Sequence, residues 1–264
     1  MTVSPPPTLA APINVQPIVT VVVTDPHDGC LSPACDVVEH AQIRSAPTRA
    51  RASQVIEARV ERLQTIQFTT LRIVPLAPLS PNRRYEIRGF SVWPLQEPER
   101  GRLLGTFRTG SYTDSAGPTW SGPARADAHS LAGPLRAARR GQGVISLPVG
   151  PEQIGPAFDV FGPTPVDDHT SPSSLRYAVW QAGDDGSIDY RRPPTAILAH
   201  EPKHDTEGRL FVAGAENECM RRAFPFPATG RYRVGIKVLD LAGNASSPGE
   251  VTIDFGGAPN KGRR

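Results

Sequence analysis

The stretch from Gly230 to Phe255, GRYRVGIKVLDLAGNASSPGEVTIDF, contains two strand patterns with a turn between them. Apolar and polar side chains alternate on both sides of the turn, and the apolar positions are Tyr232, Val234, Ile236, Val238, Val251, Ile253 and Phe255. A period of two is typical of strands that are buried on one face. The segment from Asp240 to Pro248 favours a turn, because Gly243 and Asn244 tolerate positive φ and Pro248 blocks continuation of the strand. The stretch therefore predicts a β-hairpin with one apolar side, which needs a second sheet to cover it.

The composition favours short strands and turns along the whole chain. The 264 residues include 29 prolines and 24 glycines, spread along the sequence, which is unfavourable for long helices. The length is sufficient for two domains, each with its own core. The net charge is only +3, and the basic residues do not concentrate in one segment, so we expect no nucleic-acid partner. No window approaches the roughly 20 apolar residues of a spanning helix, so we also expect no transmembrane segment.

Two tyrosines open strands in similar surroundings, one in each half of the chain. Leu79, Pro81 and Tyr85 have the spacing L-x-P-x-x-x-Y directly ahead of a strand. This is the spacing of a tyrosine corner, in which the phenol bonds back to the backbone at a turn between two sheets. A looser copy, with Phe226 ahead of Tyr232, opens the first strand of the hairpin. The two copies predict two sandwich domains.

At these residues the chain resembles bacterial Ig-like and fibronectin-type-III-like modules of secreted or cell-surface proteins. The similar segments are PLSPNRRYEIRG with GTFRTG in the first half, the linker SYTDSAGPTWSGP, and GRYRVGIKVLDLAGNASSP in the second half. The resemblance implies an all-β fold of two tandem Ig-like (fibronectin-III-like) β-sandwich domains. It also implies that Trp180 is buried against the opposite sheet of the second domain. Such modules act as spacers, stalks and binding platforms and share no active site.

The expected domain boundaries follow from these motifs. We expect a disordered Pro-rich lead-in at 1–12, a first domain at 13–112, a linker at 113–119, a longer second domain at 120–257 and a disordered tail at 258–264. The linker is short and Pro118 stiffens it, which predicts two domains that sit end to end as a rod. Trp120 is expected to supply an apolar contact across the join. The additional length of the second domain lies in 127–143 and 162–174, which are typical of loops.

The segment His200 to His204, HEPKH, matches the H-E-x-x-H pattern of zinc peptidases. That pattern places two histidines on one helical turn, with Glu201 as the general base. Pro202 lies inside the pattern and costs a helix roughly 3 kcal/mol. The flanking residues favour a strand and a turn, so we expect a hairpin loop that binds no zinc. A peptidase is the enzymatic alternative.

The cysteines allow two interpretations. His27, Cys30, Cys35 and His40 could form a tetrahedral zinc site, but their spacing is not the usual one. A disulfide between Cys30 and Cys35 is simpler, and by the chain-entropy model it stabilises a fold by about 2 kcal/mol. Cysteine-rich loops of exported domains usually oxidise, so we favour the disulfide. Cys219 is then a free thiol.

Carboxylates on loops are the remaining candidates for a metal site. They are Asp167, Asp168, Asp184, Asp185 and Asp240, the last with Asn244. Oxygen ligands on loops can bind calcium, but these residues lack the spacing of a known calcium motif. We therefore expect them to form turns, with Asp240 and Asn244 capping their own hairpin, and we expect neither a metal nor a cofactor.

The sequence predicts a non-enzymatic pair of modules in the cell envelope or outside the cell. Its role is that of a spacer or of a platform for an unknown protein or glycan partner. A cytoplasmic location is the alternative, because the N-terminal segment lacks the cationic start of a signal peptide. The functional alternatives are carbohydrate or ligand binding through the loops of the second domain, and the zinc peptidase.

Overall fold

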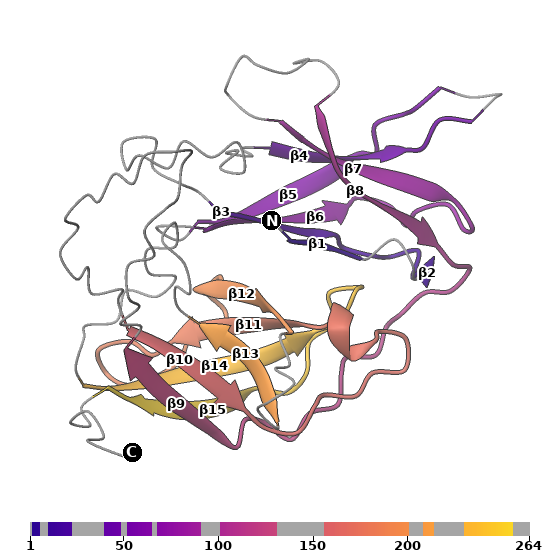
Figure 1. Cartoon of the computed structure of the whole chain (residues 1–264). Helices are drawn as coiled ribbons and strands as arrows, with labels where there is room; N and C mark the ends of the chain where they lie inside the picture. The colour runs from indigo at the N-terminus through magenta and orange to yellow at the C-terminus, as the bar shows by residue number, and fades with distance from the viewer. Residues whose placement is uncertain are drawn as a thin grey trace, which may run out of the picture.

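In the part of the chain that the structure describes, the regular secondary structure is almost entirely β-strand, and the strands form four sheets (Figure 1). The computed structural model describes residues 2–5, 10–22, 40–48, 52–64, 68–90, 101–130, 156–200, 208–213 and 230–255. Besides the strands, these ranges contain one short 3-10 turn, η2, at Pro172–Ser174. The predicted all-β class is confirmed. Within the described ranges no helix is long and apolar enough to cross a membrane.

The first half of the chain contains two four-stranded sheets, with the orders β1-β3-β6-β5 and β2-β8-β7-β4. The strands of the first sheet are β1 (Thr2–Ser4), β3 (Ile18–Val22), β6 (Phe68–Pro75) and β5 (Ala58–Gln64). Those of the second are β2 (Ala10–Ala11), β8 (Arg102–Thr109), β7 (Arg84–Phe90) and β4 (His40–Ser45). One apolar core draws on both sheets and includes Val19, Leu71 and Ile73 from one and Ile43, Tyr85, Ile87 and Phe107 from the other.

The second half contains a three-stranded sheet, β13-β10-β9, and a four-stranded sheet, β12-β11-β14-β15. The strands are β13 (Arg209–Ala213), β10 (Pro156–Phe161), β9 (Arg125–Ser130), β12 (Ala196–Ala199), β11 (Arg176–Gln181), β14 (Arg231–Leu239) and β15 (Gly249–Asp254). A second core again draws on both sheets and includes Phe158, Val160, Leu210 and Phe211 from one and Tyr177, Val179, Val234, Ile236 and Ile253 from the other.

The hairpin predicted between residues 230 and 255 is present as β14 and β15, which pair antiparallel with Tyr232 opposite Ile253. Its two strands differ in exposure. β15 shows alternating burial, whereas β14 is buried on both faces in its middle and β11 over almost its whole length. The side of the hairpin that we expected to face solvent is therefore covered at its centre.

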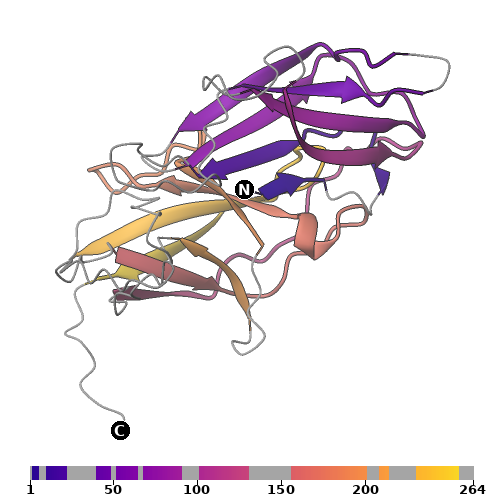
Figure 2. The ribbon, with the colours of Figure 1, turned by 45° about the horizontal axis from the view of Figure 1, so that its top comes forward.

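Part of the cover comes from the first half of the chain. Ile18 of β3 packs in one apolar cluster with Ala178, Trp180, Ile197 and Leu239 of the β11–β14 sheet. Figures 1 and 2 show the sheet that contains β3 lying beside the sheet that contains β11. The predicted end-to-end rod is therefore wrong, because strands from the two halves also pack side by side.

Two further expectations need correction. Residues 2–4 and 10–11, predicted to belong to a disordered lead-in, form β1 and β2, with Val3 opposite Val19 and Ala11 opposite Thr109. The backbone at these positions gains sheet partners, and no proline lies within either strand to obstruct the pairing. β9 occupies the start of 127–143, which we expected to be a loop. The predicted tail at 258–264 lies outside the described residues.

Candidate functional site

The turn between β14 and β15 reaches from the second half of the chain into the first. Leu241, at this turn, is only 3% exposed and belongs to the core of the first half. The backbone N–H of Gln16 donates to the carbonyl oxygen of Leu241 at 2.8 Å. Gly243 takes a φ of +84°, which a residue with a side chain rarely adopts, and the side chains of Gln16 and Arg72 occupy the space that a Cβ would need. The turn therefore packs closely against Gln16 and Arg72 of the first half.

Asp240 and Asn244 hold this turn in shape. The carboxylate of Asp240 accepts hydrogen bonds from the backbone N–H and from the side-chain amide of Asn244, each at 2.8 Å. The predicted capping of the hairpin by these two residues is confirmed. The amide of Asn244 is also within 3.2 Å of the carbonyl oxygens of Asp114 and Ala116. The turn is therefore tied to the linker as well.

Asp114 lies near the start of the predicted linker and is almost completely buried. Its carbonyl oxygen accepts a hydrogen bond from Asn14 Nδ2 at 2.6 Å, and its N–H donates to Asn14 Oδ1 at 3.1 Å. The residue is 1% exposed. Its Oδ1 accepts from the N–H of Ala116 at 3.3 Å, whereas Oδ2 is buried and has no hydrogen-bond partner among the described residues. A buried carboxylate oxygen without a donor is costly unless another positive group satisfies it.

The loop at 162–174 brings two more carboxylates to the same place. Val166 and Thr119 exchange backbone hydrogen bonds at 2.8 and 3.0 Å, which fastens the loop to the linker. Asp167 Oδ1 accepts from the N–H groups of His169 and Thr170, at 3.0 and 2.6 Å, so this residue does form a turn as predicted. Asp167 Oδ2 is buried without a partner. The side chain of Asp168 is exposed, with Oδ2 3.5 Å from Nε2 of His169.

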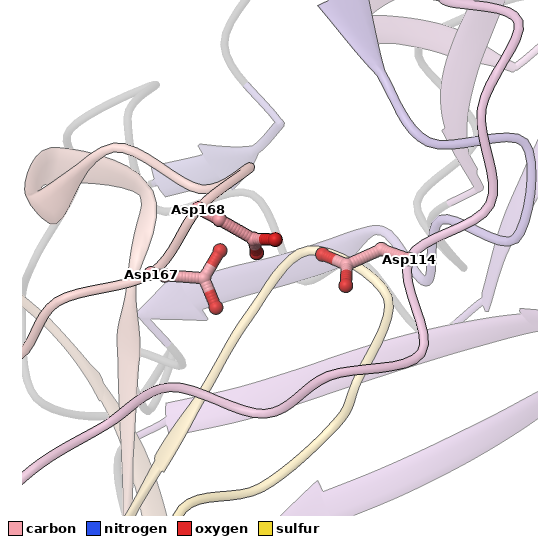
Figure 3. A group of neighbouring side chains, drawn as sticks. All are labelled: Asp114, Asp167 and Asp168. Atoms are coloured by element: carbon pink, nitrogen blue, oxygen red, sulfur yellow. The ribbon is translucent and has the colours of Figure 1, made fainter.

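Asp114, Asp167 and Asp168 together form what we call the junction acid cluster. One oxygen from each carboxylate lies within 4.8 Å of the others, and Figure 3 shows the three side chains converging from the linker and from the loop. Two unit charges at this separation near a protein surface repel by roughly 3 to 4 kcal/mol. An oxygen-lined group of this kind suits a hard divalent cation such as calcium or magnesium.

The carboxyl pKa values reflect this crowding. Burial raises the pKa of Asp114, and the charges of Asp167 and Asp168 raise it further against the opposing hydrogen bond from Ala116. Burial also raises the pKa of Asp240 to about 6, where the hydrogen bonds from Asn244 oppose the shift and Asp114 and Asp167 add to it. The charge of His169 lowers the pKa of Asp114 as well, by less than the hydrogen bond from Ala116 does. The carboxylates at the junction therefore destabilise one another's charged forms.

Tyr85 has the hydrogen bond expected of a tyrosine corner. The phenol is buried in the core of the first half, its oxygen accepts from the N–H of Ser80 at 2.9 Å, and its hydroxyl is 3.5 Å from the carbonyl oxygen of the same residue. Tyr232 is half-buried and its ring lies 5.7 Å from that of Phe255. Phe226, upstream of Tyr232, lies outside the described residues, so the second corner stays a prediction.

Trp180 and Trp120 each lie where the other was expected: Trp180 contacts the first half, and Trp120 packs against the second core. Trp180 is buried, but in the apolar cluster that contains Ile18 rather than between the two sheets of the second half. Its Nε1 donates to the carbonyl oxygen of Arg192 at 2.8 Å. Trp120, expected at the join, packs against the second core with its ring 6.2 Å from that of Tyr177. Successive side chains of a strand point to opposite faces of its sheet, so residue type alone did not give the face on which Trp180 lies.

The candidates from the two histidine-containing motifs are described only in part. His200 follows directly after β12, and its Nδ1 lies 2.9 Å from the hydroxyl oxygen of Tyr177. Glu201, His204, Cys30, Cys35 and Cys219 lie outside the described residues, as does His27. His40 opens β4 and its ring centroid lies 6.1 Å from that of Phe90. Asp185 forms a turn, since the N–H of Ser187 donates to it at 2.9 Å.

Sequence reasoning missed Asp114. It is a lone acidic residue in the polar linker SYTDSAGPTWSGP, and no local pattern distinguishes it from a solvated one. Asp167 and Asp168 were considered for calcium only as a pair. The third carboxylate comes from a segment about fifty residues away, which the bridge between Thr119 and Val166 brings alongside.

Comparison with known proteins gives distant likenesses among solved structures. No family model matches the chain, and no curated protein matches it. Among solved structures, the fibronectin(III)-like modules of Clostridium thermocellum CbhA are similar at 10% identity over 100% of this chain and 98% of that chain, with a TM-score of 0.22. TM-scores this low do not establish a common fold, so the fold assignment rests on the sheets and cores described above.

Two pullulanases have similarly low identities and TM-scores. The pullulanase of Anoxybacillus sp. LM18-11 is 8% identical over 89% of this chain, with a TM-score of 0.20. Pullulanase type I of Bacillus subtilis, complexed with maltose, is 11% identical over 96%, also with a TM-score of 0.20. The chain spans about a quarter of the length of each pullulanase chain, at 24% and 25%.

Proposed function

We propose that the chain is a non-catalytic pair of Ig-like or fibronectin-III-like β-sandwich modules that serves as a fixed spacer. The observation that carries the proposal is the double attachment between the halves. Leu241 lies in the first core, and Ile18 packs on Trp180 of the second half. A structure in which each half holds part of the other transmits position and orientation, which is the task of a spacer.

The proposal places the pair in the cell envelope or outside the cell, where it presents loops to a protein or glycan partner. The support is the resemblance of the segments PLSPNRRYEIRG and GRYRVGIKVLDLAGNASSP to exported modules. The loop at 162–174 is less available for a partner than expected, since Val166 and Thr170 bond to the linker and to the hairpin turn. Partner contacts would then come from other exposed loops.

The alternative of a zinc peptidase has no support in the geometry of His200. Its Nδ1 is engaged with the hydroxyl of Tyr177, and the residues before it form a strand, not the helix that the motif requires. Incubation of the purified chain with zinc and a mixed peptide library tests this part of the proposal. We expect no cleavage, and cleavage that is lost in His200→Ala would overturn the non-catalytic assignment.

A single-molecule distance measurement tests the spacer. Dyes attached through bio-orthogonal amino acids at the exposed positions Arg59 and Asp184 report the separation of the two halves. We expect one narrow distribution of transfer efficiencies that a flexible linker would not give. A broad distribution in the unmodified chain, equal to that of a Leu241→Ala, Trp180→Ala double variant, would show that the halves move independently and would refute the spacer.

A further inference from the structure

We infer that the junction acid cluster, Asp114 with Asp167 and Asp168, is a calcium site that fastens the linker to the loop at 162–174. This goes beyond the role of a spacer, because it assigns a ligand and a set of binding residues. Three carboxylates supply the oxygens from two segments that are distant in sequence. Figure 3 shows the side chains directed toward one common point.

A second observation, independent of the number of acids, points to a ligand. Asp114 is 1% exposed and its Oδ2 has no hydrogen-bond partner among the described residues. Asp167 Oδ2 is likewise buried and without a partner. Buried polar atoms are almost always satisfied in folded proteins. Both oxygens belong to carboxylates of the cluster, and a bound cation is the positive group that would satisfy carboxylates without donors.

The separation of the oxygens fits calcium. Calcium binds oxygen ligands at about 2.3–2.6 Å, so two ligands on opposite sides of one ion are at most about 5 Å apart. The three oxygens lie within 4.8 Å of one another. Magnesium requires a shorter distance of about 2.0–2.1 Å and a nearly ideal octahedron, so it tolerates less variation in the positions of the oxygens than calcium does. The exposed side of Asp168 leaves room for water to complete the coordination of calcium.

The residues around the site link it to both halves of the chain. Asn14 of the first half clamps the backbone of Asp114 with two hydrogen bonds. Asn244 of the hairpin turn donates to the carbonyl oxygen of the same residue. An ion held between Asp114 and Asp167 therefore couples the linker, the first half and the second half at one point.

Isothermal titration of the intact chain with calcium chloride, together with thermal unfolding, tests the inference. Partly solvated sites in extracellular modules bind calcium with Kd values of about 10⁻⁴–10⁻³ M, and we expect one site in that range. At ten times Kd, calcium should raise Tm by roughly 3 to 6 °C. Magnesium at the same concentration should have a clearly smaller effect.

Variants decide whether the ion binds at the cluster. Asp114→Asn and Asp168→Asn should each lose the calcium-dependent rise in Tm, while Asp185→Asn, an exposed turn carboxylate, should keep it. Asp168 is exposed, so its variant tests the site even if Asp114→Asn fails to fold. Absence of a saturable calcium effect in the unmodified chain would overturn the inference. So would retention of the effect in both cluster variants, or an equal effect of magnesium. None of these results would change the distance distribution that tests the spacer.

Discussion

The backbone N–H of Gln16 donates to the carbonyl oxygen of Leu241 at 2.8 Å, across the join between the two halves of the chain. The Leu241 side chain lies in the core of the first half, although the residue belongs to a hairpin of the second. Because Leu241 makes both a hydrogen bond and apolar contacts with the first half, part of the stability of each half depends on the other being folded. Their stabilities should be coupled.

Replacement of Leu241 by Ala should therefore weaken both halves. Loss of a buried leucine side chain costs about 2–5 kcal/mol, because the lost burial adds to the cavity that remains. The free energy of unfolding from denaturant titration measures this. Leu76→Ala is the matched control, since Leu76 is 62% exposed, and it should change stability by less than about 0.5 kcal/mol. Equal effects of the two variants would contradict the anchor.

Replacement of Tyr85 by Phe should remove the tyrosine corner and leave the ring in place. The N–H of Ser80 loses its acceptor at 2.9 Å, and the expected loss is about 0.5–3 kcal/mol, since the donor is left partly buried. Chemical denaturation of the two proteins gives the difference. Tyr190→Phe is the control, because its hydroxyl bonds to Glu250 at an exposed position. If Tyr85→Phe is as stable as the unmodified chain, the corner contributes nothing.

The pair of His200 and Tyr177 predicts a pH dependence. Burial lowers the pKa of His200, and the guanidinium of Arg176 lowers it further. The unfolded chain, with a histidine pKa near 6.5, then binds the proton more readily than the folded one. Stability from this residue is complete above about pH 6.5 and decreases as the pH falls through that value toward the folded-state pKa.

The free energy of unfolding, measured between about pH 8 and about pH 5, isolates this contribution when His200→Gln is compared with the unmodified chain. The variant should lose less stability on acidification. His40→Gln serves as the control, since His40 is exposed at the start of β4. Parallel pH profiles for the unmodified chain and His200→Gln would contradict the prediction.

The predicted disulfide between Cys30 and Cys35 is tested by counting thiols. Protein prepared under oxidising conditions and then denatured should show one titratable thiol, that of Cys219. Three free thiols would remove the disulfide and would weaken the proposed location outside the cytoplasm, where such pairs oxidise. A reduced and alkylated sample supplies the reference for three thiols.

Local sequence predicted the strands whose burial alternates strongly. In β7 the buried positions are Tyr85, Ile87 and Gly89, which gives a plain period of two. The strand patterns of β9 and β10 are weaker. RADAHS carries only alanines at its alternate apolar positions, and PAFDVF is short and begins with a proline. Because an alanine side chain is small, it contributes little to a pattern of alternating apolar and polar residues.

The association of the halves could not be predicted, because it depends on which strand face meets another part of the chain. Trp180 and Trp120 are both apolar residues near strand positions, and only the assembled sheets decide which one faces Ile18. The junction acid cluster is subject to the same limit. Asp114 is placed in the cluster by hydrogen bonds from Asn14 and Asn244 and by its proximity to Asp167. None of these residues is its neighbour in sequence.

Small-angle X-ray scattering of the intact chain tests the central claim, that the two halves pack side by side into one unit. The packing of Ile18 on Trp180 and of Leu241 in the first core requires a compact particle. We predict a radius of gyration near the roughly 18 Å that size scaling gives for a compact chain of 264 residues. The distribution of interatomic distances should have a single peak. A much larger radius, with the long tail of a rod of two modules placed end to end, would contradict the account.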